Sequence, residues 1–162
     1  MFPPALTALA ETVLNQARSK GVRIAAAESC TGGLICGLLT EIAGSSDVVE
    51  RGFVTYSNRA KRDLLGVPNA LITREGAVSK SVVCAMAEGA LARADAQVAV
   101  AVTGIAGPGG GSADKPVGLV HIAAIRAGGH PVHEEHRFGD IGRREVRLKT
   151  VEAALLLLST LI

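Results

Sequence analysis

The segment from residue 22 to residue 33, VRIAAAESCTGG, decides the fold that the sequence predicts. Its first six residues form a short, mostly apolar run with the length and character of a buried strand. An acid, a serine, a cysteine and a threonine follow, then two glycines, and apolar residues at helical spacing resume up to about residue 43. The pattern indicates a buried strand that turns sharply into a helix, with polar side chains at the turn.

Strands and helices alternate on both sides of this segment. Further strand patterns occupy residues 52–57, 96–104, 117–125 and 130–138, the last two joined as a hairpin by RAGG. Further helical patterns occupy residues 6–17, ended by Gly21, 58–66, capped by Asn58, 79–94, and a long stretch capped by Asp140. We expect residues 67–78 to form a loop. The alternation predicts a three-layer α/β/α sandwich with a mixed, mostly parallel sheet, in one domain over residues 1–162.

Composition excludes several classes of function. Aromatic residues make up 2% of the chain and the formal net charge is only +2, so neither base stacking nor a basic surface supports nucleic-acid binding. The cysteines at 30, 36 and 84 are odd in number and lack metal-ligand spacing, which favours a reducing compartment. No signal peptide is apparent, and the apolar C-terminal residues 153–162 are too short to span a bilayer. We therefore expect a soluble cytoplasmic protein with no membrane partner.

The last twelve residues, VEAALLLLSTLI, are apolar around much of a helix circumference. A helix that packs on one side only needs a single apolar stripe. We therefore expect a homo-oligomer that buries part of this helix.

The turn at residues 29–31 has two interpretations. Ser29 can cap the helix that follows, because serine is a common N-cap residue. Alternatively Ser29 is a nucleophile, which requires a base because a serine hydroxyl is weak unaided. Cys30 competes for that role, since a helix N-terminus lowers the pKa of a thiol, but no histidine can be placed beside it from the sequence. We expect Cys30 to be a small packing residue.

Two further loops that follow predicted strands carry polar or glycine-rich sequence. Tyr56 and Lys61 lie at the end of one strand and the start of the next helix, and a lysine becomes a base only if burial or positive neighbours lower its pKa. A surface lysine and a half-buried tyrosine remain the alternative. The loop at residues 105–116 lets the backbone approach a ligand closely and cradle an anion, although it is neither a P-loop nor a dinucleotide fingerprint. It can also be simply flexible.

The histidines of HPVHEEH, residues 130–136, suggest a metal site at first sight. His130 and His136 share one face of the predicted strand, whereas His133 points to the other face. We therefore interpret them as exposed hairpin histidines and expect no metal.

Four segments together resemble one family. AESCTGG (27–33), ERGFVTYSNRAK (50–61), GAVS (76–79) and TGIAGPGGGSADKPVG (103–118) look like those of the CinA C-terminal domain family, the nicotinamide-nucleotide amidohydrolases. The resemblance extends over about residues 6–160 and is closest to the stand-alone form. It implies deamidation of nicotinamide mononucleotide to nicotinate mononucleotide and ammonia, without a metal or other cofactor.

The resemblance also implies roles for residues. Ser29 corresponds to the nucleophile, and Tyr56 and Lys61 to its activating partners. We expect the turn and the glycine-rich loop to supply an oxyanion hole. Together with the final helix, they should also supply a phosphate site. The residues expected to bind substrate are Cys30, Thr31, Gly32, Thr103, Gly104, Gly107, Gly109 and Arg147. A solvated helix face is the alternative for Arg147.

A non-catalytic nucleotide-binding module is the competing class, with a partner role connected to competence or DNA damage. Such a module needs the glycine-rich cradle but has no need of Ser29, Tyr56 and Lys61 together. A related amidase that acts on another pyridine nucleotide also stays open.

Overall fold

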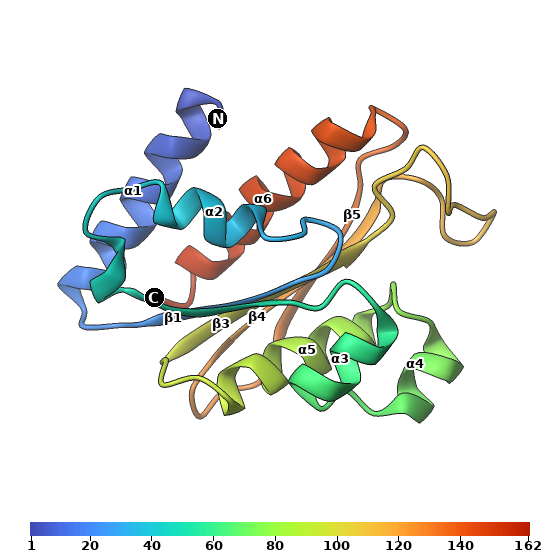
Figure 1. Cartoon of the computed structure of the whole chain (residues 1–162), viewed down its shortest axis with the longest axis horizontal. Coiled ribbons are helices and arrows are strands. Elements are labelled where there is room, and N and C mark those ends of the chain that lie inside the picture. The colour runs from blue at the N-terminus through green and yellow to red at the C-terminus, as the bar shows by residue number, and fades with distance from the viewer.

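Five strands form one mixed sheet in the computed structural model, which describes residues 1–162 (Figure 1). In spatial order the strands are β2 (Val49–Val54), β1 (Ile24–Glu28), β3 (Val98–Gly104), β4 (Leu119–Arg126) and β5 (Val132–Arg137). β1 is parallel to both of its neighbours, whereas β4 is antiparallel to β3 and to β5. Only β4 therefore runs against the other strands, which confirms the predicted mixed, mostly parallel sheet.

Helices cover both faces of the sheet, so the predicted three layers are confirmed. Figure 1 shows α1 (Pro4–Ser19), α2 (Leu34–Thr40) and α6 (Arg143–Ser159) on one side. On the other side lie α3 (Asn58–Leu65), α4 (Asn69–Glu75) and α5 (Lys80–Ala92). A short 3-10 helix, Ser45–Asp47, leads into β2.

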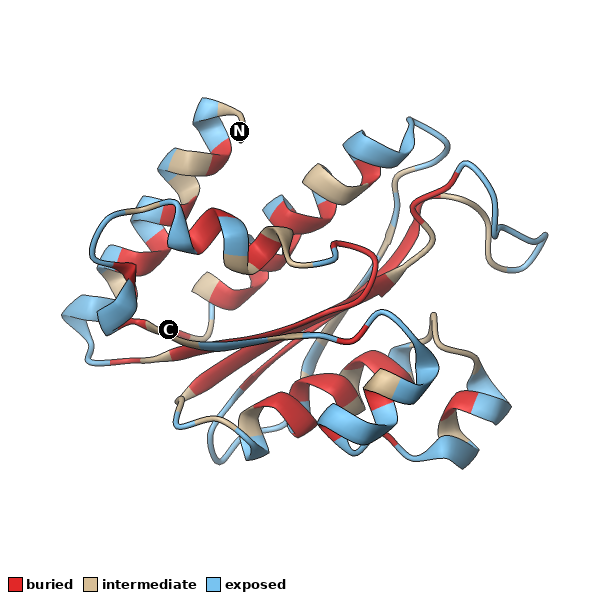
Figure 2. Cartoon of the chain, viewed as in Figure 1, coloured by how far each residue is buried: buried red, intermediate tan, exposed pale blue.

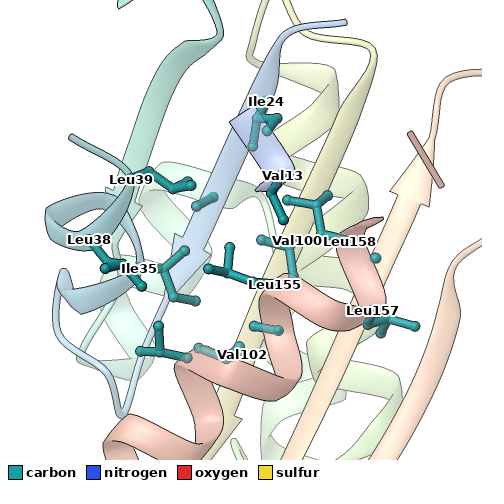
Figure 3. Packing of buried hydrophobic residues seen from close by; sticks show 14 of the residues in the cluster. Val13, Ile24, Ile35, Leu38, Leu39, Val100, Val102, Leu155, Leu157 and Leu158 are labelled. Atoms are coloured by element: carbon teal, nitrogen blue, oxygen red, sulfur yellow. The ribbon is translucent and has the colours of Figure 1, made fainter. Parts of the chain in front are cut away.

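Alternate residues of the central strands supply two separate cores. Figure 2 shows buried residues along these strands and on helices on both sides of the sheet. Val98, Val100 and Val102 pack with α1, α2 and α6, and Figure 3 shows Val100 and Val102 beside Leu155 of α6 and Ile35 of α2. Ala99 and Ala101 face α5 instead. Since β1 is buried along its whole length, it reads as a nearly continuous apolar run, as expected for a strand covered on both faces.

Several boundaries differ from the sequence expectations. β2 covers residues 49–54 rather than 52–57, because its partner β1 ends at Glu28, which is paired with Val54. Ser57, and not Asn58, caps α3, since its Oγ accepts a 3.0 Å hydrogen bond from the amide of Ala60. Asp140 does not cap α6, whose N-cap is Gly142.

The expectation of a loop over residues 67–78 was wrong in part. A seven-residue helix, α4, begins after Pro68 and ends at Gly76. Proline before the helix and glycine after it are ordinary boundary residues, but a single buried residue, Ile72, left too little periodicity to recognise the helix.

The histidines of residues 130–136 were predicted to be exposed, which is confirmed for His130, whereas His133 and His136 are half-buried. His121 on β4, for which no such prediction was made, is buried. Its side chain is 7% exposed, and its Nδ1 lies 2.9 Å from Nε2 of His133. β4 lies inside the sheet under α5, so a polar residue on that face is covered, and burial lowers the pKa of both imidazoles.

The final helix buries most of its apolar residues within the chain. Leu155, Leu157 and Leu158 belong to the core, whereas Leu156 is 51% exposed. Packing against α1, α2 and the sheet therefore accounts for most of its apolar circumference. None of the helices combines the length and apolar character needed to cross a membrane.

Candidate active site

Loops that follow β1, β2 and β3 meet at the carboxyl edge of the sheet and enclose a cavity of about 290 Å³. This is the edge at which parallel α/β sheets hold their ligands. Most of the residues predicted to form the site line it: Ser29, Cys30, Tyr56, Lys61, Thr103, Gly104, Gly107 and Gly109. Three more lining residues, Ile105, Ala106 and Gly110, belong to the glycine-rich loop that the sequence singled out. The remaining lining residues were not predicted from the sequence: Asn58, Ala77, Val78 and Arg143.

Ser29 does not cap α2, because its neighbour Glu28 does so. The Glu28 carboxylate is fully buried and accepts hydrogen bonds from the amides of Gly33 (3.0 Å), Ile35 (3.0 Å) and Cys36 (2.9 Å). The Ser29 amide donates to the carbonyl of Val102 on β3 at 3.1 Å. Its Oγ makes no bond to α2, so the helix-cap interpretation of Ser29 is wrong.

Lys61 lies directly beside Ser29 in the buried interior. Its Nζ donates hydrogen bonds of 2.9 Å to Ser29 Oγ and of 2.9 Å to the carbonyl of Thr55, and the residue is only 1% exposed. No carboxylate forms an ion pair with it. Burial therefore lowers the pKa of Lys61 from its ordinary value, and Cys30 opposes this only in part. The alternative of a surface lysine is wrong.

Cys30 is buried next to Ser29 with its thiol protonated. Burial raises the pKa of the Cys30 thiol to about 12, and the negative charge of Glu28 adds to the rise, although Lys61 and Arg147 oppose it. Only a thiolate is an effective nucleophile, so this cysteine is poorly suited to attack a substrate.

Two backbone amides at the turn have no partner in the protein. The N–H groups of Cys30 and Thr31 donate to no protein acceptor, although both residues are buried. A buried amide normally has a partner, and of these two residues Cys30 lines the cavity beside Ser29, so its unpaired amide is available to receive a developing negative charge.

Tyr56 and Arg143 pair at the mouth of the cavity. Tyr56 is 59% exposed, and its hydroxyl accepts a 2.8 Å hydrogen bond from Nη2 of Arg143. Nη1 of Arg143 donates to the carbonyl of Gly107 at 2.8 Å. The Tyr56 hydroxyl is hydrogen-bonded neither to Ser29 nor to Lys61. Sequence reasoning missed Arg143, which had only its position in the basic stretch GRREVRLK to mark it.

The glycine-rich loop forms one wall of the cavity. Gly104 is required there because a Cβ atom would lie 2.7 Å from the Val120 side chain and 3.0 Å from the Leu119 carbonyl. The amides of Gly109 and Gly110 have no protein acceptor, so the wall presents unpaired donors. Thr103 is held by a 2.9 Å bond from its hydroxyl to the Ala77 carbonyl.

Thr31, Gly32 and Arg147 do not line the cavity. Arg147 instead binds the backbone of the turn. Arg147 Nε donates to the Cys30 carbonyl at 3.1 Å, and its Nη2 donates to the Thr31 carbonyl at 2.8 Å. Gly32 has a φ of +59° and lies against this guanidinium. A solvated helix face is therefore the wrong interpretation of Arg147, and its guanidinium binds backbone.

The curated relatives include proteins much longer than this chain and a protein of similar length. A CinA-like protein of Syntrophobacter fumaroxidans is 53% identical over 150 residues, which cover 93% of this chain and 35% of that protein. The chain thus spans about a third of the length of such relatives. A nicotinamide-nucleotide amidohydrolase PncC of Enterobacter agglomerans is 50% identical over 139 residues, which cover 85% of this chain and 84% of that protein.

Solved structures share the whole fold. The competence/damage inducible protein CihA from Agrobacterium tumefaciens is 57% identical and superposes with a TM-score of 0.98, over 99% of this chain and 98% of that one. The competence damage-inducible protein A (ComA) from Klebsiella pneumoniae is 35% identical with a TM-score of 0.91, over 96% and 95% of the two chains. The family model of the CinA C-terminal domain matches residues 6–162. On this evidence the chain belongs to the CinA C-terminal domain family.

Proposed function

We propose that this chain hydrolyses the carboxamide of nicotinamide mononucleotide to nicotinate mononucleotide and ammonia, with Ser29 as nucleophile and Lys61 as its base. The contact between Ser29 Oγ and the buried Nζ of Lys61 carries the proposal. A relative of nearly the same length that is named a nicotinamide-nucleotide amidohydrolase supports the choice of substrate.

Acylation begins with Lys61 in its neutral form. A neutral amine has two N–H groups and one lone pair, so one N–H can stay bonded to the Thr55 carbonyl while the lone pair accepts the Ser29 proton. Ser29 Oγ attacks the carboxamide carbon and forms a tetrahedral intermediate. As the C–N bond breaks, Lys61 returns the proton to the leaving nitrogen, which departs as ammonia.

Deacylation repeats the same proton transfers with water. Lys61 takes a proton from the attacking water, whose oxygen bonds to the acyl carbon, and returns it to Ser29 Oγ as the ester bond breaks. The product forms as the pyridine carboxylic acid, which loses the second proton of the water to solvent and leaves as the carboxylate, and the enzyme regains its starting protonation. No metal or other cofactor is needed for this sequence of steps.

We assign the oxyanion hole to the unpaired amide of Cys30, which lines the cavity. Cys30 follows the nucleophile directly in the chain, and its amide has no protein acceptor. Thr103 and Gly104 also line the cavity and provide the alternative that the sequence suggested. Loss of one such donor typically costs about 100- to 1,000-fold in rate.

For the phosphate of the nucleotide we propose Arg143 and the amides of Gly109 and Gly110. All three residues line the cavity, whereas Arg147 does not. The guanidinium of Arg143 lies at the cavity mouth, and its planar pair of N–H donors can bind two oxygens of a phosphate. The direct contact of Lys61 with Ser29 removes the need for Tyr56 in proton transfer. We propose instead that Tyr56 orients Arg143 and covers the bound substrate.

Ammonia release from nicotinamide mononucleotide tests the proposal, measured for wild type, Ser29→Ala and Cys30→Ala with a chelator present. We expect release by wild type and by Cys30→Ala, and none by Ser29→Ala. A wild type that binds the nucleotide but releases no ammonia would establish the non-catalytic binding module instead. Nicotinamide and other pyridine nucleotides, run in parallel, define the substrate range.

Homo-oligomerisation and a cytoplasmic location stay predictions. The exposed Leu156 is the part of the final helix that a second copy can cover. Light scattering at micromolar concentration tests this, and a mass equal to the 16.6 kDa monomer would contradict it. The three cysteines are free, which fits a reducing compartment.

A further inference from the structure

The side chain of Glu28 is an unusual buried charge. It is 0% exposed, and no lysine, arginine or histidine forms an ion pair with it. A carboxylate in such a place needs strong hydrogen bonds to offset its desolvation. It receives four: Oε2 accepts from the Thr31 hydroxyl (2.6 Å) and the amides of Gly33 and Ile35, and Oε1 accepts from the Cys36 amide.

These four bonds pair some of the hydrogen-bond donors of the turn and leave others free. A helix start leaves several amides without partners, and Glu28 takes those of α2 together with the Thr31 hydroxyl. The amides of Cys30 and Thr31, which follow the nucleophile in the chain, stay unpaired. The turn therefore satisfies its structural donors completely and leaves free only the two beside Ser29.

Glu28 also removes a competing role for Ser29. Serine at the start of a helix commonly caps it, and a capping hydroxyl would be engaged with amides rather than with a base. With the cap supplied by Glu28, the Ser29 hydroxyl lies against Lys61 instead. Burial raises the pKa of the Cys30 thiol, and the adjacent negative charge of Glu28 adds to that rise, so the neighbouring thiol stays protonated.

We propose that Glu28 is the positioning residue of the active-site turn: its buried carboxylate fixes residues 31–36, which frees Ser29 Oγ for Lys61 and holds the Cys30 amide open for the oxyanion. This inference rests on the proposed function of Ser29. Glu28 does not touch the substrate and acts through the geometry of the turn.

The test compares Glu28→Gln and Glu28→Ala with wild type in ammonia release from nicotinamide mononucleotide. A glutamine side chain would keep one oxygen acceptor and place an N–H₂ group against an amide, so it should lose part of the effect and the alanine variant more. We expect kcat to fall about 10- to 100-fold in Glu28→Gln and further in Glu28→Ala, with KM within about 3-fold of wild type, because the oxyanion forms only in the transition state.

A second assay measures Ser29 directly, without the proposed substrate. A sulfonyl fluoride labels an activated serine when Oγ displaces fluoride at sulfur, and intact mass with Ser29→Ala as the blank assigns the label. We expect labelling of Glu28→Gln to be at least about 10-fold slower than that of wild type. Leu14→Ala, a core variant remote from the cavity, controls for lost stability: at a similar melting temperature it should keep wild-type kcat and labelling rate.

The two assays separate the possible failures. Wild-type labelling at Ser29 without ammonia release would overturn the proposed substrate and still test Glu28 through the labelling rates. Folded Glu28→Gln with wild-type kcat or wild-type labelling would overturn the positioning role, as would an equal loss in Leu14→Ala. A wild type that neither releases ammonia nor takes the label would overturn both proposals.

Discussion

Ser29 Oγ and Lys61 Nζ lie 2.9 Å apart although 32 residues separate them in the chain. Ser29 follows β1 directly, and Lys61 lies in the first turn of α3, which begins shortly after β2. β1 and β2 are parallel neighbours, so their carboxyl ends meet at one edge of the sheet and bring the two side chains together. The same packing excludes water from Lys61, and this burial lowers the pKa of the lysine, as its proposed role as base requires.

Replacement of the base should abolish most of the activity. Lys61→Met keeps a flexible side chain of similar length but has no lone pair that can accept the Ser29 proton at this position. General-base catalysis contributes about 100- to 10,000-fold, so we expect kcat for ammonia release to fall by that factor. Lys61→Arg should be as inactive, because a guanidinium stays protonated.

The wild-type pH profile is the control for this interpretation. The proposed mechanism requires neutral Lys61, so kcat/KM should rise with pH and then reach a plateau. The pKa that describes this rise should lie below 10.5, the ordinary value for lysine. A rise in kcat/KM whose pKa is not below 10.5, or a methionine variant with wild-type kcat, would contradict the role of Lys61 as base.

Lys61 should also make the stability of the fold depend on pH. Its pKa is lowered in the folded protein, so between that pKa and about 10.5 the unfolded chain binds more protons than the folded one. The free energy of unfolding must therefore rise with pH in this window, and the penalty is largest below it. Denaturant melts at several pH values should show this rise in wild type, and the rise should be smaller in Lys61→Met.

Most of the architecture could be predicted from the sequence, because the strands and long helices carry strong apolar periodicity. The carboxyl-end rule accounts for why Ser29, Lys61 and the loop after β3, all singled out from the sequence, line one cavity. The role of Glu28 was not predicted, since no pattern distinguishes a buried capping carboxylate from an exposed one. Arg143 was missed for a related reason: only the packing of α6 brings its guanidinium across to Tyr56.

The cysteine beside the nucleophile should be dispensable. A thiol with a pKa of about 12 holds almost no thiolate at neutral pH, so Cys30 can contribute little as a nucleophile. Cys30→Ala should keep kcat within about 3-fold of wild type, and iodoacetamide at pH 7 should not inactivate the enzyme. Rapid inactivation that Cys30→Ala abolishes would instead assign the chemistry to the thiol.

Arg143 should act on the phosphate of the substrate and not on its carboxamide. Hydrogen bonds to a charged group contribute about 1.5–3 kcal/mol, so Arg143→Gln should raise KM for nicotinamide mononucleotide by about 10- to 100-fold with little change in kcat. With nicotinamide riboside, which lacks the phosphate, the variant and wild type should have similar KM values. Arg144→Gln, an exposed neighbour with no bonded partner, is the matched control.

Two helix glycines should respond to alanine in opposite directions. Gly89 is buried in α5, and a Cβ atom there would clash with the carbonyl oxygen of Leu65 at the end of α3. The backbone of Leu65 cannot yield as a side chain can, so Gly89→Ala should lower the free energy of unfolding by about 1–3 kcal/mol. Gly37 is exposed in α2, and its nearest neighbour, a Phe2 ring atom, would lie at 3.8 Å from a Cβ.

Gly37→Ala should therefore raise the free energy of unfolding by about 0.5–1 kcal/mol, because alanine loses less backbone freedom than glycine in a helix. Urea melts of the two variants beside wild type measure both effects. The two signs follow from different physics: close approach of α5 to α3 at Gly89, and helix propensity alone at Gly37. If Gly89→Ala were as stable as wild type, the contact between α5 and α3 would have to be looser than the structure has it.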